Sequence, residues 1–187
     1  MASDHPTLVH RTLQTTIPLV SSITAGLSLS LSFFMVPRLL EAPVAVMLQQ
    51  WQCTYRQGAV TMVPLCLVSG VSYLWLALQH TSSSSAAGAG MLSSWRGKSF
   101  LAAGLLTAGV VPYTAAFMMG TNRRLMERAD REAAAKGKVT EFSDKILEQE
   151  KSAKALVDWW GVLNLVRGVM LTVGSACGLA AATATAA

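Results

Sequence analysis

The feature that most constrains this chain is a series of long apolar blocks that carry almost no charge. The first covers residues 17–36, and its twenty positions include no Asp, Glu, Lys or Arg. As a helix rising about 1.5 Å per residue it spans about 30 Å, the thickness of a bilayer core. Similar blocks cover residues 59–78, 100–120 and 159–182. Since backbone groups in lipid must be satisfied within the segment, the pattern predicts an all-α bundle of four transmembrane helices.

Composition also indicates lipid as the solvent, and we treat residues 1–187 as one integral membrane domain. The chain is 52% hydrophobic and 13% charged, whereas soluble domains are about 25% charged. The net charge is +5, but nine of the fifteen basic residues share one loop with eight acids. This mixture excludes the one-sided basic surface typical of nucleic-acid binding. A signal peptide is disfavoured for the first block, because Pro37 and Arg38 follow it in place of a small-residue cleavage site.

Small residues on two of the blocks predict where the helices pack. Ser22, Gly26 and Ser30 recur every four residues on the first span, and Gly174 and Gly178 form a GxxxG pattern on the fourth. Such faces let helices approach closely within a membrane. We do not infer a homodimer from them, because small residues are common in membrane spans.

The segments between the spans differ in character. Residues 81–94 form a Ser/Ala/Gly tract that predicts a low-complexity loop. The third loop holds ERADREAAAK, a strong helix former, followed by Gly137 as a breaker and a second helical stretch from about Ser143. We therefore expect a charged helical hairpin on the cytosolic side that extends the third and fourth spans.

Orientation follows from the basic residues outside the spans. The first and third loops carry eleven Lys and Arg residues, whereas the N-terminus and the second loop carry three. By the positive-inside rule, loops one and three are cytosolic and both termini lie on the opposite side. The endoplasmic reticulum is the default membrane for a eukaryotic multi-span chain of this kind.

The fourth span alone carries strongly polar residues in its interior. Trp160, Asn164 and Arg167 are spaced i, i+4, i+7 and so share one helical face. An arginine within a span costs about 2.5–3.5 kcal/mol, so it faces the bundle interior or a wet cavity. The alternative is snorkelling, in which the side chain reaches the interface and acts as an anchor. Asn164 on the same face also needs a polar partner, which favours the interior.

Other polar residues gather at the same end of the bundle. Asn122 and Arg123 end the third span, and Arg56 precedes the second. The histidines lie elsewhere, in the N-terminal tail and at the far end of the second span. No His, Cys or carboxylate grouping has metal-ligand spacing, and no phosphate loop is present, so we expect neither a metal nor another cofactor. Arginine and asparagine donors beside aromatic rings suit a delocalised anion such as a phenolate or enolate.

Two motifs in these positions carry a resemblance to a known family. They are TNRRL at residues 121–125 and WGVLNLVR at residues 160–167, the second with the form W-x3-N-x2-R. A Ser/Gly-rich first span ending in Pro37 and the Arg56-x-Gly58 before the second span support them. With these features the chain resembles the anthrone oxygenase-like family of small four-span membrane proteins. The resemblance implies a membrane-bound oxygenase of aromatic polyketide pathways, which oxidises an anthrone to an anthraquinone with O2 and without a prosthetic group.

The resemblance also suggests roles for individual residues. Four donors would stabilise the substrate oxyanion: Arg167, Asn164, Asn122 and Arg123. Flat rings would be bound by Trp160 and Tyr113, with Arg56 beside them. Asp158 and Glu41 are the candidate bases, although an acidic substrate needs no dedicated base.

Two other functions remain open at this point. A non-catalytic scaffold would use the charged hairpin to gather pathway enzymes. A small transporter is the second alternative, but such proteins commonly show internal repeats and helices broken at mid-membrane. This chain shows no similarity between its halves, and its polar residues lie towards one end.

Overall fold

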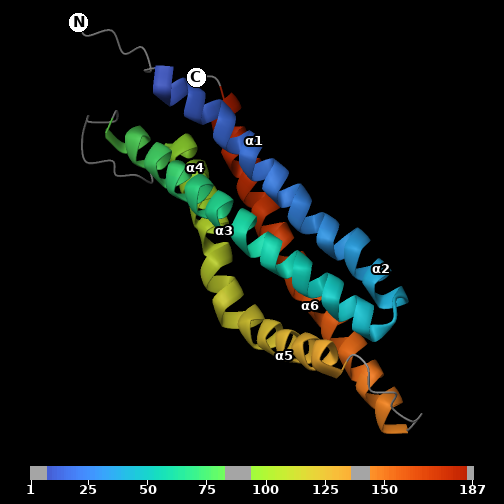
Figure 1. Ribbon diagram of the computed structural model, residues 1–187. Helices are drawn as coiled ribbons and strands as arrows, with labels where there is room; N and C mark the ends of the chain where they lie inside the picture. The colour runs from blue at the N-terminus through green and yellow to red at the C-terminus, as the bar shows by residue number, and fades with distance from the viewer. Residues whose placement is uncertain (1–7, 83–93, 136–143, 185–187) are drawn as a thin grey trace, which may run out of the picture.

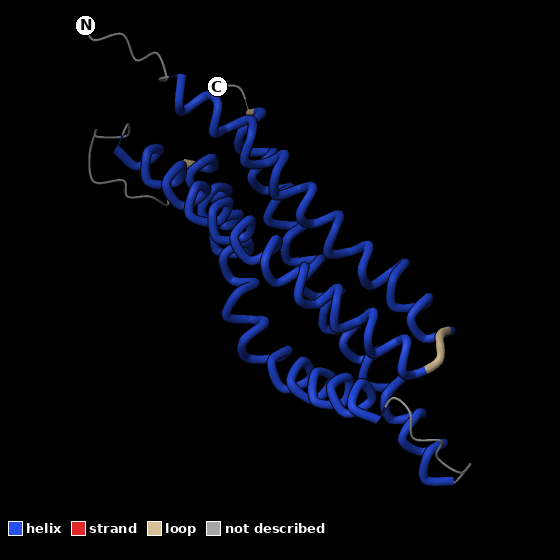
Figure 2. Tube along the Cα trace, viewed as in Figure 1, coloured by secondary structure: helices blue, strands red, loops and turns tan. Residues whose placement is uncertain are grey.

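The computed structural model describes residues 8–82, 94–135 and 144–184 (Figure 1). Within these ranges the chain forms helices and short connections, with no strand (Figure 2). The elements in chain order are α1 (Leu8–Ser30), η1 (Leu31–Met35), α2 (Val36–Glu41), α3 (Val44–Ser82), α4 (Trp95–Tyr113), η2 (Thr114–Met118), α5 (Met119–Ala135) and α6 (Asp144–Thr183). The elements named η are π-helical turns, which join α1 to α2 and α4 to α5 without a break.

Four helical units are long and apolar enough to cross a membrane, which confirms the predicted fold class. They run over Arg11–Glu41, Val44–Gln79, Trp95–Ala134 and Leu147–Thr183. The chain is therefore a multi-pass membrane protein. Figure 1 shows the units side by side along one long axis, with both termini at the same end. The turn between α2 and α3 lies at the opposite end, together with the end of α5 and the start of α6.

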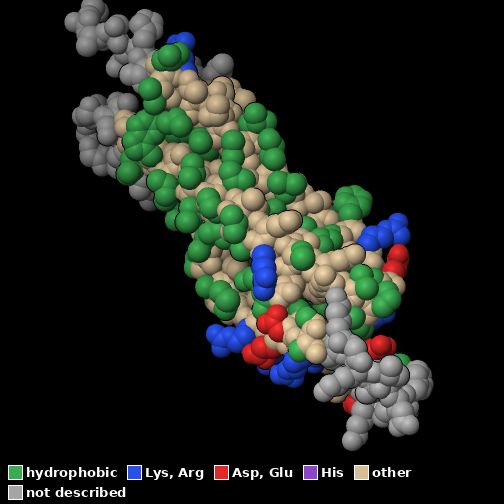
Figure 3. Space-filling view, viewed as in Figure 1, with side chains coloured by type: hydrophobic (Ala, Val, Ile, Leu, Met, Phe, Trp, Pro, Cys, Tyr) green, Lys and Arg blue, Asp and Glu red, His purple; other side chains and the backbone are tan. Residues whose placement is uncertain are grey.

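Charge is concentrated at that opposite end. Figure 3 shows Lys, Arg, Asp and Glu side chains over α2, α5 and the start of α6, and hydrophobic side chains over most of the remaining surface. The helices α5 and α6 continue the third and fourth spans into this charged region. Gly137, Ser143 and residues 83–93 of the predicted Ser/Ala/Gly loop lie outside the described residues. The cytosolic location of the hairpin stays a prediction.

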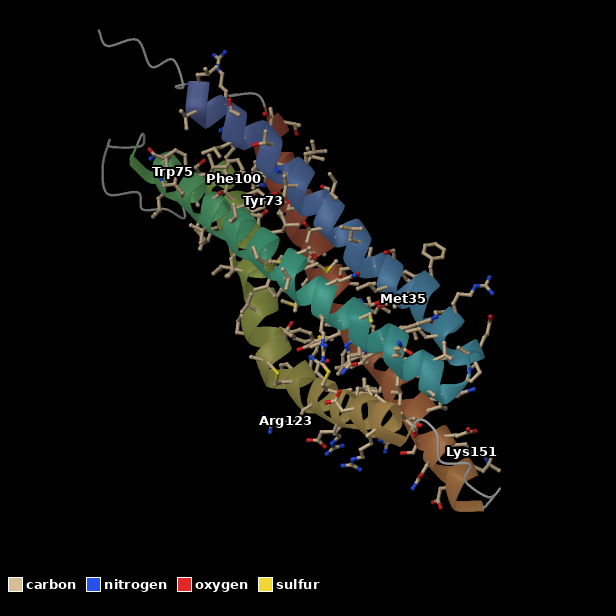
Figure 4. The ribbon with its side chains drawn as sticks, viewed as in Figure 1. Met35, Tyr73, Trp75, Phe100, Arg123 and Lys151 are labelled. Atoms are coloured by element: carbon tan, nitrogen blue, oxygen red, sulfur yellow. The ribbon has the colours of Figure 1, made fainter. Side chains whose placement is uncertain are left out.

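Small residues bring α3, α4 and α6 close together in the half of the bundle near the termini. A Cβ atom added to Gly70 of α3 would lie 2.8 Å from the Cβ atom of Ala108 in α4. A Cβ atom on Gly178 of α6 would overlap the ring of Tyr73 in α3. Tyr73 in turn stacks on Phe100 of α4, with ring centroids 6.3 Å apart (Figure 4). The GxxxG pattern of the fourth span thus packs against helices of the same chain.

The prediction that Ser22 and Gly26 form the packing face of the first span is wrong. Ser22 and Gly26 are exposed, and a Cβ atom on Gly26 would meet nothing within 4 Å. The buried face is turned by one residue, because Ser21 lies 2.7 Å from the Tyr73 hydroxyl of α3 and accepts a hydrogen bond from Ser175 of α6. Buried hydroxyls need partners, so the face that offers them turns inward.

Both π-helical turns lie next to a proline. Pro37 lies two residues after the end of η1, and Pro112 lies two residues before the start of η2. Proline lacks the N–H that a helix interior uses, so a helix accommodates it by bending or by a locally wider turn. Figure 1 shows the resulting change of direction between α4 and α5. The sequence analysis did not anticipate these turns, although π-helical turns are frequent at functional sites.

Candidate functional site

A cavity of about 210 Å³ lies between α3, the segment from α4 through η2 to the start of α5, and α6, with Leu31 of η1 also on its wall. It occupies the half of the bundle towards the charged end. Most of its wall is apolar, and the polar groups on it are few. Ligand sites in proteins commonly combine an apolar wall with a small number of placed polar groups. The lining residues used below are Tyr55, Ala59, Met62, Val63, Cys66, Ala115, Met119, Trp160 and Arg167.

Arg167 is the one charged side chain among the lining residues. Its Nη2 donates to Oδ1 of Asn164, and its Nε lies 3.4 Å from the hydroxyl of Ser28. Nη2 also lies 3.9 Å from the Met62 sulfur. No carboxylate in residues 8–82, 94–135 or 144–184 forms an ion pair with it. A guanidinium held by neutral groups keeps its full charge, and that charge faces the cavity.

Asn164 is completely buried and does not line the cavity. Its Nδ2 donates to the Ser28 carbonyl oxygen at 2.8 Å and to the Ser32 hydroxyl at 2.9 Å. The Ser32 hydroxyl donates onward to the carbonyl oxygen of Gly161 at 2.9 Å. Both Nδ2 hydrogens and Oδ1 are therefore occupied within the protein. In this arrangement Asn164 ties α1 to α6 and orients Arg167.

An aromatic group borders the cavity beside Arg167. Trp51 stacks on Tyr55 with centroids 5.3 Å apart and meets Trp160 edge-on at 5.9 Å. Tyr55 and Trp160 line the cavity, whereas Trp159 is exposed. The Nε1 atom of Trp160 is buried and has no hydrogen-bond partner in the described part of the chain. A buried indole N–H usually has a partner, so this unsatisfied donor on a cavity-lining residue is a candidate for bonding a ligand oxygen.

The residues predicted at the end of the third span and before the second do not line the cavity. Asn122 is buried, and neither of its side-chain amide atoms has a partner among the described residues. Arg123 is exposed and points away from the bundle on the outer side of α5 (Figure 4). Arg56 is exposed on α3. The structure thus separates these three from Arg167.

The remaining predicted residues also lie outside the cavity wall. The Tyr113 hydroxyl donates to the Leu163 carbonyl oxygen at 3.1 Å, and its ring packs on Phe117. Asp158 is exposed, and Glu41 is exposed in an ion pair with Arg38 at 3.1 Å. No carboxylate of the described residues is part of the cavity wall.

Comparison with known proteins identifies the family of this chain. A family model described as anthrone oxygenase matches residues 51–177, which include every cavity-lining residue except Leu31. The chain belongs to the anthrone oxygenase family. It is accordingly an oxidoreductase of the oxygenase class.

Three fungal relatives of the anthrone oxygenase family share most of this chain. An anthrone oxygenase of Claviceps purpurea (strain 20.1) is 30% identical over 176 residues, covering 92% of this chain and 87% of the relative. An anthrone oxygenase of Aspergillus fumigatus is 29% identical over 178 residues, covering 87% and 91%. One of Pestalotiopsis fici is 25% identical over 148 residues, covering 78% and 93%. No solved structure matches the chain.

Several residues that build the candidate site of this anthrone oxygenase family member were not predicted from the sequence. Ser28 and Ser32 hold Asn164 and Arg167, and Trp51 supports Tyr55 and Trp160. Met62 and Cys66 line the cavity. A weak signal existed in the i, i+4 spacing of Ser28 with Ser32 and of Trp51 with Tyr55. That spacing indicates a shared face, but it does not say which face points inward.

The described residues of this family member include no cluster of three His, Cys, Asp or Glu side chains that could hold a metal ion. The polar groups on the cavity wall include a guanidinium, an indole, a phenol and a thiol, from Arg167, Trp160, Tyr55 and Cys66. These groups can bind and orient an aromatic anion and can donate hydrogen bonds to its oxygens.

Proposed function

We propose that this protein is a membrane-bound, cofactor-free anthrone oxygenase that converts an anthrone-type polyketide to an anthraquinone with O2. One observation carries the proposal: the Arg167 guanidinium faces a mostly apolar cavity and has no carboxylate partner among the described residues. A charge in such surroundings attracts an anion strongly, because little water screens it. The three relatives, all named anthrone oxygenases, support the same reaction.

The oxidation needs no electrons beyond those of the substrate. Loss of one proton from the central methylene of an anthrone gives an enolate, and this anion transfers an electron to O2. The carbon radical and superoxide combine, and protonation of the new peroxide gives a hydroperoxide. Loss of the second methylene proton with cleavage of the O–O bond yields the quinone carbonyl and water. One oxygen atom enters the product, and the other leaves as water.

In this mechanism the protein lowers the free energy of the enolate. Arg167 is placed to stabilise the oxyanion, and the free Nε1–H of Trp160 is a second donor for a substrate oxygen. Donors that are already oriented lose little energy to reorganisation when charge develops. Tyr55, backed by Trp51, presents an aromatic surface for the flat rings. Since no described carboxylate lines the cavity, we infer that the acidity of the bound substrate replaces a dedicated base.

The proposal is tested with purified protein in liposomes and an anthrone under air. Quinone formation by absorbance and O2 uptake by electrode are compared with the spontaneous rate. Arg167→Ala should lower kcat by about 10²–10³-fold, the usual effect of removing an oxyanion donor. Arg167→Lys should restore only part of this loss, because an ammonium cannot keep the planar contacts with Asn164 and Ser28.

Arg124→Ala serves as the matched control, since Arg124 is an exposed arginine that contacts no part of the cavity. Its rate should equal that of the wild type. A wild-type rate no higher than the spontaneous rate would exclude the oxygenase function for that substrate and favour the scaffold alternative. Full activity in Arg167→Ala would place the site elsewhere. Activity that survives exhaustive metal chelation supports the cofactor-free reaction.

We also propose that the protein resides in the endoplasmic reticulum with its charged end in the cytosol. The basic residues of the first and third loops support this orientation, because the ends of these loops lie together in the charged region (Figures 1 and 3). The polyketide substrate would then reach the cavity near the cytosolic face.

A further inference from the structure

We propose that the substrate enters the cavity sideways from the hydrocarbon of the membrane, through an opening between α3 and the η2–α5 segment. This inference rests on the proposed function for the identity of the substrate, a flat aromatic molecule that ionises next to Arg167. The opening itself is argued from the cavity wall.

The position of the opening follows from the lining residues that are also exposed on the surface. There are four: Ala59 and Val63 on α3, Ala115 on η2, and Met119 at the start of α5. All four are apolar, and they belong to two helical units of the bundle. Figure 3 shows hydrophobic side chains over the surface of α3 and α4 outside the charged end. Because the most exposed part of the cavity wall is apolar and lies between two spans, we infer that the cavity opens there towards lipid.

The close packing of α3 and α4 is lost towards this opening. Nearer the termini the two helices touch at Gly70 and Gly104, where an added Cβ atom would clash with the neighbouring helix. Pro112 and the π-helical turn η2 then redirect the third span, as Figure 1 shows. Because no glycine contact joins α3 to η2 and the helix direction changes, side chains as small as Ala59 and Ala115 leave a space between them.

Two exposed arginines, Arg56 and Arg123, indicate how deep in the membrane the opening lies. Arg56 lies three residues before Ala59 on α3, and Arg123 lies four residues after Met119 on α5. Both arginines are exposed, and each lies about 5 Å along its helix from the opening, towards the charged end. Arginine side chains at such positions reach the headgroup region. The opening therefore begins just inside the hydrocarbon, beneath the headgroups.

This depth suits one class of molecule, a flat polycyclic phenol. Such a molecule keeps its hydroxyls near the headgroups and its rings in the outer hydrocarbon, as amphipathic aromatic rings do in membrane interfaces. From there it passes edge-first between α3 and η2, and its oxygens meet Arg167 and Trp160. A strongly hydrated, multiply charged molecule is excluded because it does not leave the water.

Chemical modification of the Cys66 thiol measures access to the cavity independently of catalysis. Its thiol lines the cavity and is 2% exposed, so it reacts only with a reagent that has entered. The protein for this test carries Cys53→Ser and Cys177→Ser, and it is placed in liposomes. N-phenylmaleimide, which dissolves in lipid, should modify Cys66, whereas a sulfonated maleimide of similar size should not. The extent of modification is measured by intact-protein mass spectrometry. The negative control is the same protein with Cys66→Ser added, which has no cysteine.

Two matched pairs of variants locate the opening. Ala115→Trp fills its edge, whereas Ala116→Trp adds the same ring at the next exposed alanine of η2, which does not line the cavity. Val63→Trp and Val60→Trp form the corresponding pair on α3. Ala115→Trp and Val63→Trp should slow Cys66 modification and lower kcat/KM for the anthrone about tenfold, and their partners should change neither.

The outcomes separate the route from the reaction. Modification by N-phenylmaleimide that Ala115→Trp slows, in a protein that oxidises no anthrone, would support the opening and reject the proposed function. Normal oxidation with equal kcat/KM in both members of each pair would reject the opening and keep the function. Failure of N-phenylmaleimide to reach Cys66, or equally fast reaction with the sulfonated reagent, would overturn access from lipid.

Discussion

At the scale of single residues, the decisive feature is how the protein holds a charge inside a membrane bundle. Arg167 is supported by Asn164 and by the hydroxyl of Ser28, all neutral groups. A carboxylate in their place would stabilise the guanidinium more but would neutralise the positive field that we propose binds the substrate anion. Asn164 is best described as a positioning residue, because its amide is saturated within the protein.

Trp160 offers a test at this scale. The variant Trp160→Phe keeps an aromatic ring against Trp51 but removes the unpaired Nε1–H. We expect a loss of about 1–2 kcal/mol of binding to the ionised substrate, seen as a roughly tenfold lower kcat/KM. Trp159→Phe is the control, since Trp159 is exposed and lies outside the cavity wall. Equal kinetics in the two variants would show that the indole N–H makes no bond to substrate.

At the scale of elements, the bundle divides into a tightly packed half and a half that contains the cavity. Glycines let α3, α4 and α6 approach near the termini. Towards the charged end, two π-helical turns beside Pro37 and Pro112 interrupt the regular helices. Both turns contribute to the site: Ser32 of η1 holds Asn164, and Ala115 of η2 lines the cavity. Both irregular elements thus contribute residues to the candidate site.

The close packing of the half near the termini predicts a difference in stability between two glycine variants. Gly178→Ala places a methyl group against the Tyr73 ring and should destabilise the protein by about 1–3 kcal/mol, as overpacking usually does. Gly26→Ala should leave stability unchanged or slightly higher, because nothing lies within 4 Å of the added methyl. Thermal unfolding in detergent measures both. A midpoint in Gly178→Ala as high as that of the wild type would mean that α3 and α6 are not in close contact there.

At the scale of the whole molecule, the arrangement has a charged end, a cavity near it, and both termini at the far end. Four spans return the chain to the side on which it began, as Figure 1 shows. The loops that carry most of the basic residues then share one side of the membrane. This common side is what allows a charge count to predict the orientation.

Glycosylation mapping tests the orientation of the whole molecule. Acceptor sites placed on an extension of the C-terminus should be glycosylated in microsomes, because we assign that end to the lumen. Acceptor sites inserted between residues 136 and 143 should remain unmodified, since we assign that loop to the cytosol. The reversed pattern would invert the topology while leaving the four-helix fold intact.

How far the sequence predicts this protein depends on whether a property is local. The four spans follow from apolar length alone, since lipid forces each such segment to satisfy its own backbone groups. The shared face of Trp160, Asn164 and Arg167 follows from helical periodicity. These properties, and membership in the oxygenase family signalled by two short motifs, were determined by the sequence itself.

The tertiary structure decided which faces meet. It turned Ser21 and Ser28 inward in place of Ser22 and Gly26, and it packed Trp51 against the cavity-lining rings of Tyr55 and Trp160. Arg56, Arg123, Asp158 and Glu41 share the end of the bundle with the cavity, yet each is exposed and none lines it. The physical reason is that the rotation of each helix about its axis depends on glycine contacts, prolines and hydroxyl partners supplied by other helices. No local pattern in one segment contains that information.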